Sequence, residues 1–407
     1  MRLSNNEVDV LRRLGEKYME YANLPIQREK MNMWKALNGL KPIRPMVDIN
    51  ELPWGELVKI APEQLTEKIT DPYWRCVEGA LRRKIFQWEN FPADMILEPF
   101  VDIAAAMNWG YYGISPSEEH SASSRYNNLL QTWDDIEKIK DISFVHDEKQ
   151  TEANLQDAQF IFGGIAPTKL YIGERFHLGM WDMLTRFMGV EAIYYDIIDR
   201  PDFAHALMRR ITDATLAGIK SLNDLRMYDD NLNILRCSYT YTNEFLPDFG
   251  AGKSGVSKNC WALGTAQLFT SVSPDTTEEF EIPYISELAK EFGFIYYGCC
   301  ERLDDRLDLV KKIPNVRKIS CSSWSDREAF AKNLGNNFVM SAKPTPSYLS
   351  GGFKEDVVRD DIIRYCDAAK ENGLAIELLL KDITTINNDL AALKKWHDIA
   401  MEVVAKY

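Results

Sequence analysis

The sequence predicts an α/β fold in which eight parallel strands alternate with helices and close into a barrel. Short apolar runs alternate with longer stretches of helical spacing through much of the 407-residue chain. The runs are apolar on both faces, which is typical of parallel strands covered by helices. Gly293, Gly335 and Gly373 follow helical stretches, where a helix end often needs a positive φ. An open doubly wound sheet is the alternative fold.

The composition supports an ordered, acidic protein. Hydrophobic residues make up 45% of the chain, which is enough for a sizeable core. The net charge is −13, and no basic cluster interrupts it, so nucleic acid and anionic membranes are not expected partners. No apolar run reaches the roughly 18 residues of a membrane span. The chain opens without a signal-peptide pattern, and its seven scattered cysteines indicate reduced thiols in a cytoplasm.

The domain prediction has two parts. Residues 1–41 form a helical extension, because Ser4 and Glu7 fit a capping box and a second helix covers Gln27–Leu37. Residues 42–407 form the barrel, with insertions at 104–160 and 231–260. The predicted strands begin at Met46, Met95, Leu170, Gln267, Phe294, Val316, Phe338 and Leu374.

The connecting segments are predicted mainly as helices. Ser273, Pro274 and Asp275 supply a cap, a first-position proline and a first-turn carboxylate for one of them. Ser322 or Ser323 is expected to cap another. The remaining predicted segments are helices at Pro62–Trp88, Leu155–Phe162, His177–Met188 and Pro201–Met227, a surface loop at 108–124, and an extra strand at Ile234–Tyr241 inside the second insertion.

Polar side chains follow several predicted strands, and in a barrel these strand ends face one pocket. Cys299, Cys321 and Asp382 end three of the last strands, and thiolates with a carboxylate are suitable zinc ligands. Cys300 is an alternative ligand, although adjacent strand residues point to opposite faces. The competing interpretation is that these thiols are unpaired core residues.

The catalytic candidates are Glu98, Glu301 and His177. Glu98 follows an apolar run and suits a general base, a metal ligand or a substrate anchor, against the alternative of a surface acid. Glu301 directly follows the two thiols. His177 lies beside Glu174, and a lone histidine there is more often structural.

The substrate-binding candidates come from the same strand ends. Lys343 and Lys381 each follow a predicted strand, and Gln267 opens one. Tyr297 belongs to a group of aromatic residues that suits a flat, apolar substrate, although core packing explains each aromatic residue alone.

Three stretches carry a family resemblance: Gln267–Ile282, Tyr296–Glu301 and Arg317–Trp324. They resemble the uroporphyrinogen decarboxylase superfamily, which also contains corrinoid-linked and cobalamin-independent methyltransferases. The resemblance extends from about Pro45 to the C-terminus. It implies a TIM-type (β/α)8 barrel, often dimeric.

Two family motifs differ in this chain. The methyltransferases carry a His-x-Cys zinc motif after a strand, and the matching residues here are Tyr297, Gly298 and Cys299, without the histidine. The later ligands of that group fall near Cys321 and Asp382. The decarboxylases carry an arginine-rich motif after the first strand, whereas residues 46–53 contain no arginine. Uroporphyrinogen decarboxylation is therefore disfavoured.

The resemblance and the strand-end residues together predict a methyltransferase. It would move a methyl group from a small O- or N-methyl compound to a separate corrinoid protein, with zinc as a possible cofactor and a homodimer as the expected assembly. A decarboxylase or lyase acting on a small or tetrapyrrole-like acid is the first alternative. A non-catalytic ligand-binding barrel is the second.

Overall fold

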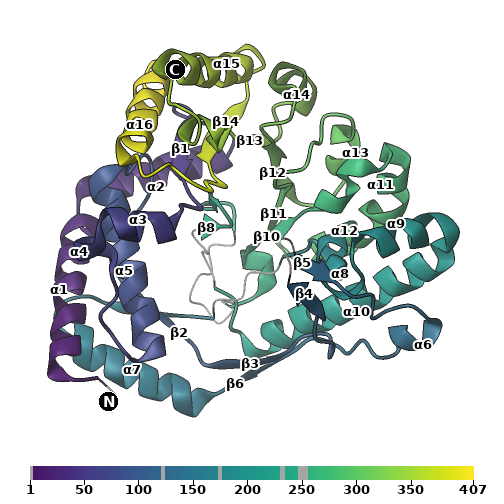
Figure 1. Ribbon diagram of the computed structural model, residues 1–407, viewed down its shortest axis with the longest axis horizontal. Helices are drawn as coiled ribbons and strands as arrows, with labels where there is room; N and C mark the ends of the chain where they lie inside the picture. The colour runs from purple at the N-terminus through teal and green to yellow at the C-terminus, as the bar shows by residue number, and fades with distance from the viewer. Residues whose placement is uncertain (1–2, 121–123, 173–176, 230–233, 246–254) are drawn as a thin grey trace.

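The computed structural model describes residues 3–120, 124–172, 177–229, 234–245 and 255–407. The chain is an α/β protein in which helices surround parallel strands (Figure 1). Two helices, α1 (Asn5–Ala22) and α2 (Pro25–Asn38), precede the first strand. Ser4 caps α1 and forms the predicted capping box with Glu7. Among the described segments, no helix has the length and apolar character that crossing a bilayer requires.

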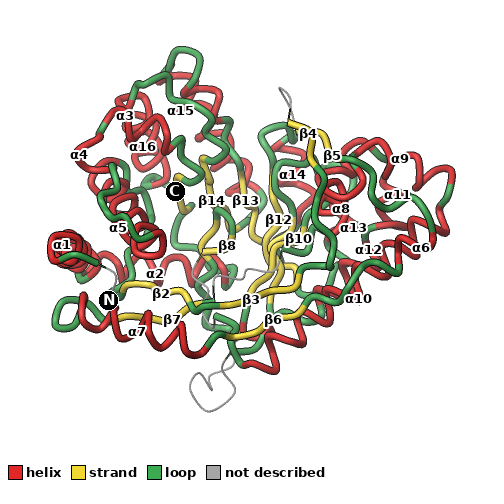
Figure 2. The backbone as a smooth tube through the Cα atoms, turned by 60° about the horizontal axis from the view of Figure 1, so that its bottom comes forward, coloured by secondary structure: helices red, strands yellow, loops and turns green. Residues whose placement is uncertain are grey.

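The main sheet has six parallel strands in the order β1-β14-β13-β12-β11-β10, several of them labelled side by side in Figure 2. Their bounds are β1 (Met46–Ile49), β10 (Trp261–Gly264), β11 (Phe294–Tyr297), β12 (Val316–Cys321), β13 (Val339–Ala342) and β14 (Ala375–Leu380). A separate parallel pair joins β2 (Val101–Ala104) to β7 (Thr168–Tyr171). One parallel bridge links His177 to Leu263 of β10. The six strands of the main sheet run in the same direction, so their C-terminal ends lie at one edge.

Helices and short strands fill the connections. The first half contains α3 (Trp54–Ile60), α4 (Pro62–Leu65), α5 (Pro72–Asn90), β3 (Met107–Gly110), β4 (Glu118–His120), β5 (Ser124–Tyr126), α6 (Trp133–Ile136), β6 (Ser143–His146), α7 (Glu148–Phe162), α8 (Met180–Met188), α9 (Val190–Asp199) and α10 (Pro201–Leu225). The second half contains β8 (Ile234–Leu235), β9 (Ser238–Tyr239), η1 (Ser257–Asn259), η2 (Gln267–Ser271), α11 (Pro274–Phe280), α12 (Ile282–Ala289), α13 (Leu307–Val310), α14 (Arg327–Leu334), η3 (Pro346–Leu349), α15 (Glu355–Glu371) and α16 (Leu390–Val404).

The strand predicted to begin at Gln267 is wrong. The strand is β10, six residues earlier, and all four of its residues are buried. Gln267 opens the 3-10 helix η2, because the carboxylate of Asp182 accepts hydrogen bonds from the backbone N–H groups of Gln267 and Leu268, each at 2.9 Å. Those N–H groups are therefore not available to a strand ladder.

The strand predicted at Met95–Leu97 is also wrong. Side chains take its backbone donors: Ile96 N–H donates to the hydroxyl of Tyr239 and Leu97 N–H donates to Gln27. The strand in this region is β2, which begins four residues after Leu97.

Smaller differences concern element ends. Asp326 caps α14, so neither of the two serines predicted for this role is the cap. The helix predicted from His177 begins at Met180. The predicted loop at 108–124 includes most of β3 and the whole of β4, and the extra strand at Ile234–Tyr241 is the hairpin of β8 and β9.

Candidate functional site

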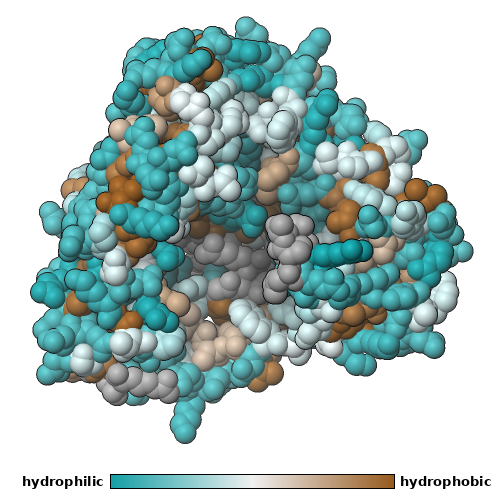
Figure 3. Space-filling model, in the orientation of Figure 1, coloured by the Kyte–Doolittle hydropathy of each residue, from teal (hydrophilic) through white to brown (hydrophobic). Residues whose placement is uncertain are grey.

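A pocket of about 620 Å³ lies at the C-terminal ends of β11, β12, β13 and β14. This edge of a parallel sheet is where α/β enzymes usually hold their ligands. Hydroxyl groups, two thiols and two lysines dominate the lining. The lining residues are Cys299, Cys300, Ser322, Ser323, Trp324, Lys343, Pro344, Thr345, Pro346, Ser347, Ser350, Lys381, Asp382, Thr384 and Thr385. The face of the molecule seen in Figure 3 is hollowed towards its centre.

The turn after β11 fixes the position of Cys299. Gly298 has φ +94°, and a Cβ atom there would lie 2.9 Å from side-chain atoms of Leu303 and Ser320. Glycine therefore suits both the backbone and the close packing at this turn. The hydroxyl of Ser320 donates to the carbonyl of Cys299 at 2.8 Å.

Glu301 holds the same turn from the other side. Its carboxylate accepts a hydrogen bond of 2.6 Å from the backbone N–H of Cys299 and another of 2.6 Å from the hydroxyl of Thr265. Glu301 is buried, and this burial raises its pKa. Glu301, which was predicted to be catalytic, thus holds the backbone of Cys299 in place.

The Cys299 side chain has the properties of a thiolate. Its Sγ lies 3.5 Å from Sγ of Cys300 and 3.3 Å from Nζ of Lys381. The hydrogen bond from the Cys300 thiol and the positive charges of Lys381 and Arg236 lower the pKa of Cys299 to about 5, although burial opposes the shift. At neutral pH Cys299 is therefore anionic, while its anionic charge helps to raise the pKa of Cys300.

Carboxylates complete the charge cluster. Lys381 Nζ lies 3.3 Å from Glu51 and 3.1 Å from Asp382, and Sγ of Cys300 lies 3.2 Å from the Asp382 carboxylate. Burial alone would lower the pKa of Lys381, but the surrounding thiol and carboxyl groups raise it. Lys381 is therefore a firmly protonated ammonium that is shared among anionic groups.

The hairpin of β8 and β9 contributes Arg236, whose Nε lies 3.3 Å from Glu51. Arg236, Glu51 and Asp382 all have left-handed backbones, with φ of 57°, 49° and 56°. Such conformations are costly for residues other than glycine, and they gather at binding and catalytic sites. Three of them in one cluster indicate that the geometry here is imposed by the fold.

Below this cluster, the sheet encloses a polar network. Lys318 and Glu377 form a fully buried ion pair at 2.6 Å, and Ser238 of the hairpin bonds to both side chains. Lys343 bonds to the hydroxyl of Tyr296 and, at 2.8 Å, to the hydroxyl of Ser341. Lys343 is a predicted substrate-binding residue, and it lines the pocket without an anionic hydrogen-bond partner in the described part of the chain.

Of the other predicted residues, two do not line this pocket. Tyr297 is buried behind the turn, and its hydroxyl donates to Glu281 at 3.3 Å. Gln267 is exposed and contacts Asp182. Neither residue is therefore placed to contact a substrate in this pocket.

Neither of the two remaining catalytic candidates lines this pocket, although the charges of Arg236 and Cys299 act on His177. Glu98 lines a second cavity, where burial raises its pKa to about 6. Nδ1 of His177 accepts the N–H of Gly179 at 3.2 Å, and burial lowers the pKa of His177. Glu174 lies outside the described residues.

The predicted zinc ligands are only partly assembled. Cys299 and Asp382 both contact Cys300, but Cys321 is fully buried and does not line the pocket. Burial raises the pKa of Cys321 to about 12, so its thiol is protonated at neutral pH. Within the described ranges, no group of three His, Cys, Asp or Glu side chains is arranged to hold a metal ion. These residues therefore do not fit the predicted zinc site.

Three important residues were not predicted: Arg236, Thr265 and Ser320. Arg236 lies far from the other cluster residues in sequence and only the hairpin brings it close. Thr265 directly follows β10, so a correct assignment of that strand would have placed it at a strand end, whereas Ser320 lies within the correctly predicted β12 and no sequence signal marked it.

Comparisons with known proteins leave function open. No known family matches the chain, and no curated protein matches it in sequence. Solved structures do match, among them one described as a methyltransferase from Methanosarcina mazei. That match has a TM-score of 0.49 and 12% identity, and it covers 91% of this chain and 97% of the other.

Proposed function

We propose that this protein is a methyltransferase that takes a methyl group from a small O- or N-methyl compound held in the strand-end pocket. The observation that carries the proposal is the Cys299 thiolate, held at the pocket by Lys381 and Cys300. A thiolate with a lowered pKa is a strong nucleophile, and methyl carbon is a suitable electrophile for it. The sequence resemblance to a superfamily that contains methyltransferases agrees with this choice.

The reaction uses groups that are already in contact. The thiolate attacks the methyl carbon, a C–S bond forms, and the bond from carbon to the donor oxygen or nitrogen breaks. The electron pair stays on the leaving heteroatom, which needs a proton when it leaves as an anion. Lys381 is suited to supply it, because methylation removes the anionic charge of Cys299 that helps to keep Lys381 protonated.

The resemblance implies a corrinoid on a partner protein as the acceptor. A reduced corrinoid supplies a strong nucleophile for methyl groups. The proposal places the partner at the strand-end face and includes no metal step, because the described residues do not assemble a zinc site. The closed eight-stranded TIM-type barrel, the homodimer and the cytoplasmic location are part of the same proposal.

The test is to incubate the purified protein with deuterium-labelled 4-methoxybenzoate, trimethylamine or methanol, without an acceptor. A thioether is a stable product, so one labelled methyl group should accumulate on Cys299 and be found by peptide mass spectrometry. Cys299→Ser should acquire no label, whereas the matched control Cys366→Ser, on α15, should be labelled normally. Turnover of a donor without methylated Cys299 would contradict the covalent step.

Decarboxylation is the second candidate, because Lys343 is a cation that lines the pocket with neutral hydrogen-bond partners. Such a cation suits a substrate carboxylate. Release of labelled carbon dioxide from small carboxylic acids, with its loss in Lys343→Met and no methylated cysteine, would favour this candidate.

A further inference from the structure

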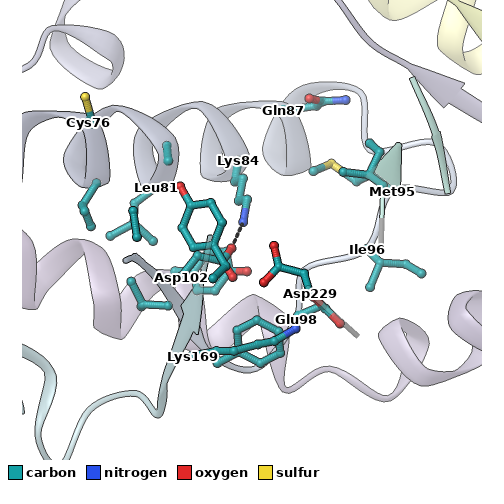
Figure 4. Close-up of a pocket in the computed structure, with 18 of the residues that line it drawn as sticks. Cys76, Leu81, Lys84, Gln87, Met95, Ile96, Glu98, Asp102, Lys169 and Asp229 are labelled. Carbon is teal, nitrogen blue, oxygen red and sulfur yellow. Dashed lines mark hydrogen bonds and ion pairs between the residues drawn. The ribbon is translucent and has the colours of Figure 1, made fainter. Parts of the chain in front are cut away.

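A second cavity, also of about 620 Å³, lies between α5, β1, β2, β7 and β9. Its size is typical of small-molecule sites. Four carboxyl groups and two ammonium groups line it, together with six aromatic rings. In Figure 4 the side chains of Lys84, Asp102, Asp229 and Glu98 point towards one another across the cavity. The charged lining residues are Asp48, Lys84, Glu98, Asp102, Lys169 and Asp229, and the aromatic ones are Tyr18, Tyr73, Phe100, Tyr171, Tyr239 and Tyr241.

Asp48 is the unusual member of this lining. Its side chain is only 2% exposed, and its Oδ2 accepts one hydrogen bond of 3.2 Å from Asn50. Its Oδ1 is buried and has no hydrogen-bond partner within the described residues. A buried carboxyl oxygen without a partner is costly, so its presence beside a cavity points to a ligand that compensates it with a positive charge or an N–H donor.

Both lysines of the lining already interact with other side chains. Lys84 pairs with Asp102 at 3.4 Å and lies 5.6 Å from the ring centre of Tyr18. Lys169 lies 5.1 Å from the ring centre of Phe100. Neither lysine contacts Asp48, so the cavity holds an excess of carboxyl groups. Burial raises the pKa of Asp48 to about 8.

The aromatic residues supply the other half of a cation site. Tyr239 and Tyr241 stack with ring centres 5.9 Å apart and planes 8° apart. Aromatic faces attract ammonium groups, including fully methylated ones that cannot donate hydrogen bonds. A carboxyl group beside several tyrosine rings is therefore complementary to a compact organic cation.

We propose that this cavity binds a small organic cation, with its ammonium centre against Asp48 and its alkyl groups against the tyrosine rings. The cavity is lined by neither Cys299 nor Lys381, so the binding site is separate from the strand-end pocket and does not depend on the proposed methyl transfer.

The experiment is isothermal titration calorimetry of the full chain at about pH 9, where Asp48 is ionised, with tetramethylammonium chloride, next to neutral tert-butanol and sodium acetate. Tetramethylammonium should bind at least tenfold more tightly than either control. Asp48→Asn should weaken this binding about tenfold or more, whereas Asp134→Asn, an exposed aspartate on α6, should not.

A second variant covers the case in which Asp48→Asn fails to fold. Ala80 lines the cavity from α5 and is exposed, so Ala80→Trp should fill the space without removing any charge. Binding should then be lost while the thermal unfolding temperature is kept. The proposal is overturned if tetramethylammonium binds no better than tert-butanol, if acetate binds better, or if the folded Ala80→Trp protein binds as the wild type does.

Discussion

Lys381 helps to lower the pKa of Cys299, and replacing that lysine by methionine tests how large its contribution is. Methionine keeps most of the side-chain volume and removes the charge. The Nζ–Sγ distance is 3.3 Å, and at an effective dielectric constant of about 20 one such pair is worth about 5 kcal/mol. Glu51 and Asp382 bind the same ammonium at 3.3 and 3.1 Å and offset part of its charge. We therefore expect Lys381→Met to raise the pKa of Cys299 by about 2, from its present value near 5.

The assay is the rate of iodoacetamide alkylation at Cys299 as a function of pH, followed by peptide mass spectrometry so that Cys300 is counted separately. The wild type should react with a midpoint near pH 5, and Lys381→Met with a midpoint about 2 higher. Lys332→Met, on an exposed face of α14, is the matched control and should follow the wild type. An unchanged midpoint in Lys381→Met, or a wild-type midpoint near the ordinary value for cysteine, would refute the reasoning.

Two further predictions concern stability, both measured by urea unfolding. Lys318→Met should lower the free energy of unfolding by about 3–5 kcal/mol, because it leaves the buried Glu377 without its ion-pair partner. The double variant Lys318→Met with Glu377→Leu should recover much of that loss. A double variant as unstable as the single variant would contradict this prediction. Burial raises the pKa of Asp48 from 3.8 to about 8, so its contribution to stability is fully present below about pH 4 and is lost as pH rises from there to about 8. Between about pH 5 and pH 8 the stability of Asp48→Asn relative to the wild type should therefore increase by up to about 4 kcal/mol, and a constant difference would show that Asp48 is not desolvated.

Much of the fold follows from local sequence signals. β1 begins at the predicted residue, Met46, and β11–β14 begin within one residue of prediction, because continuous apolar runs between helices leave few alternatives. The strand predictions at Met95–Leu97 and at Gln267 are wrong for the same reason. Side chains distant in sequence, from Tyr239, Gln27 and Asp182, take the backbone donors that a strand would use.

The residues of the candidate site could also be predicted only in part. Cys299, Cys300, Lys343, Lys381 and Asp382 could be predicted because each follows a strand, and parallel strands place their C-terminal ends together. The zinc ligand set could not be tested by spacing alone. Whether Cys321 faces the pocket depends on the twist and packing of β12, and its side chain is buried away from the pocket lining.

By itself, the sequence determined an acidic α/β chain with thiols and lysines at its strand ends, since periodicity and composition are local properties. Only the tertiary structure decided which of those groups interact. It brought Lys381 to 3.3 Å from Cys299, inserted Arg236 from a hairpin and left one Asp48 oxygen beside a cavity without a hydrogen-bond partner in the described part of the chain. The pKa of a thiol and the cost of a buried carboxylate depend on distance and solvent exposure, and these quantities exist only once the chain has folded.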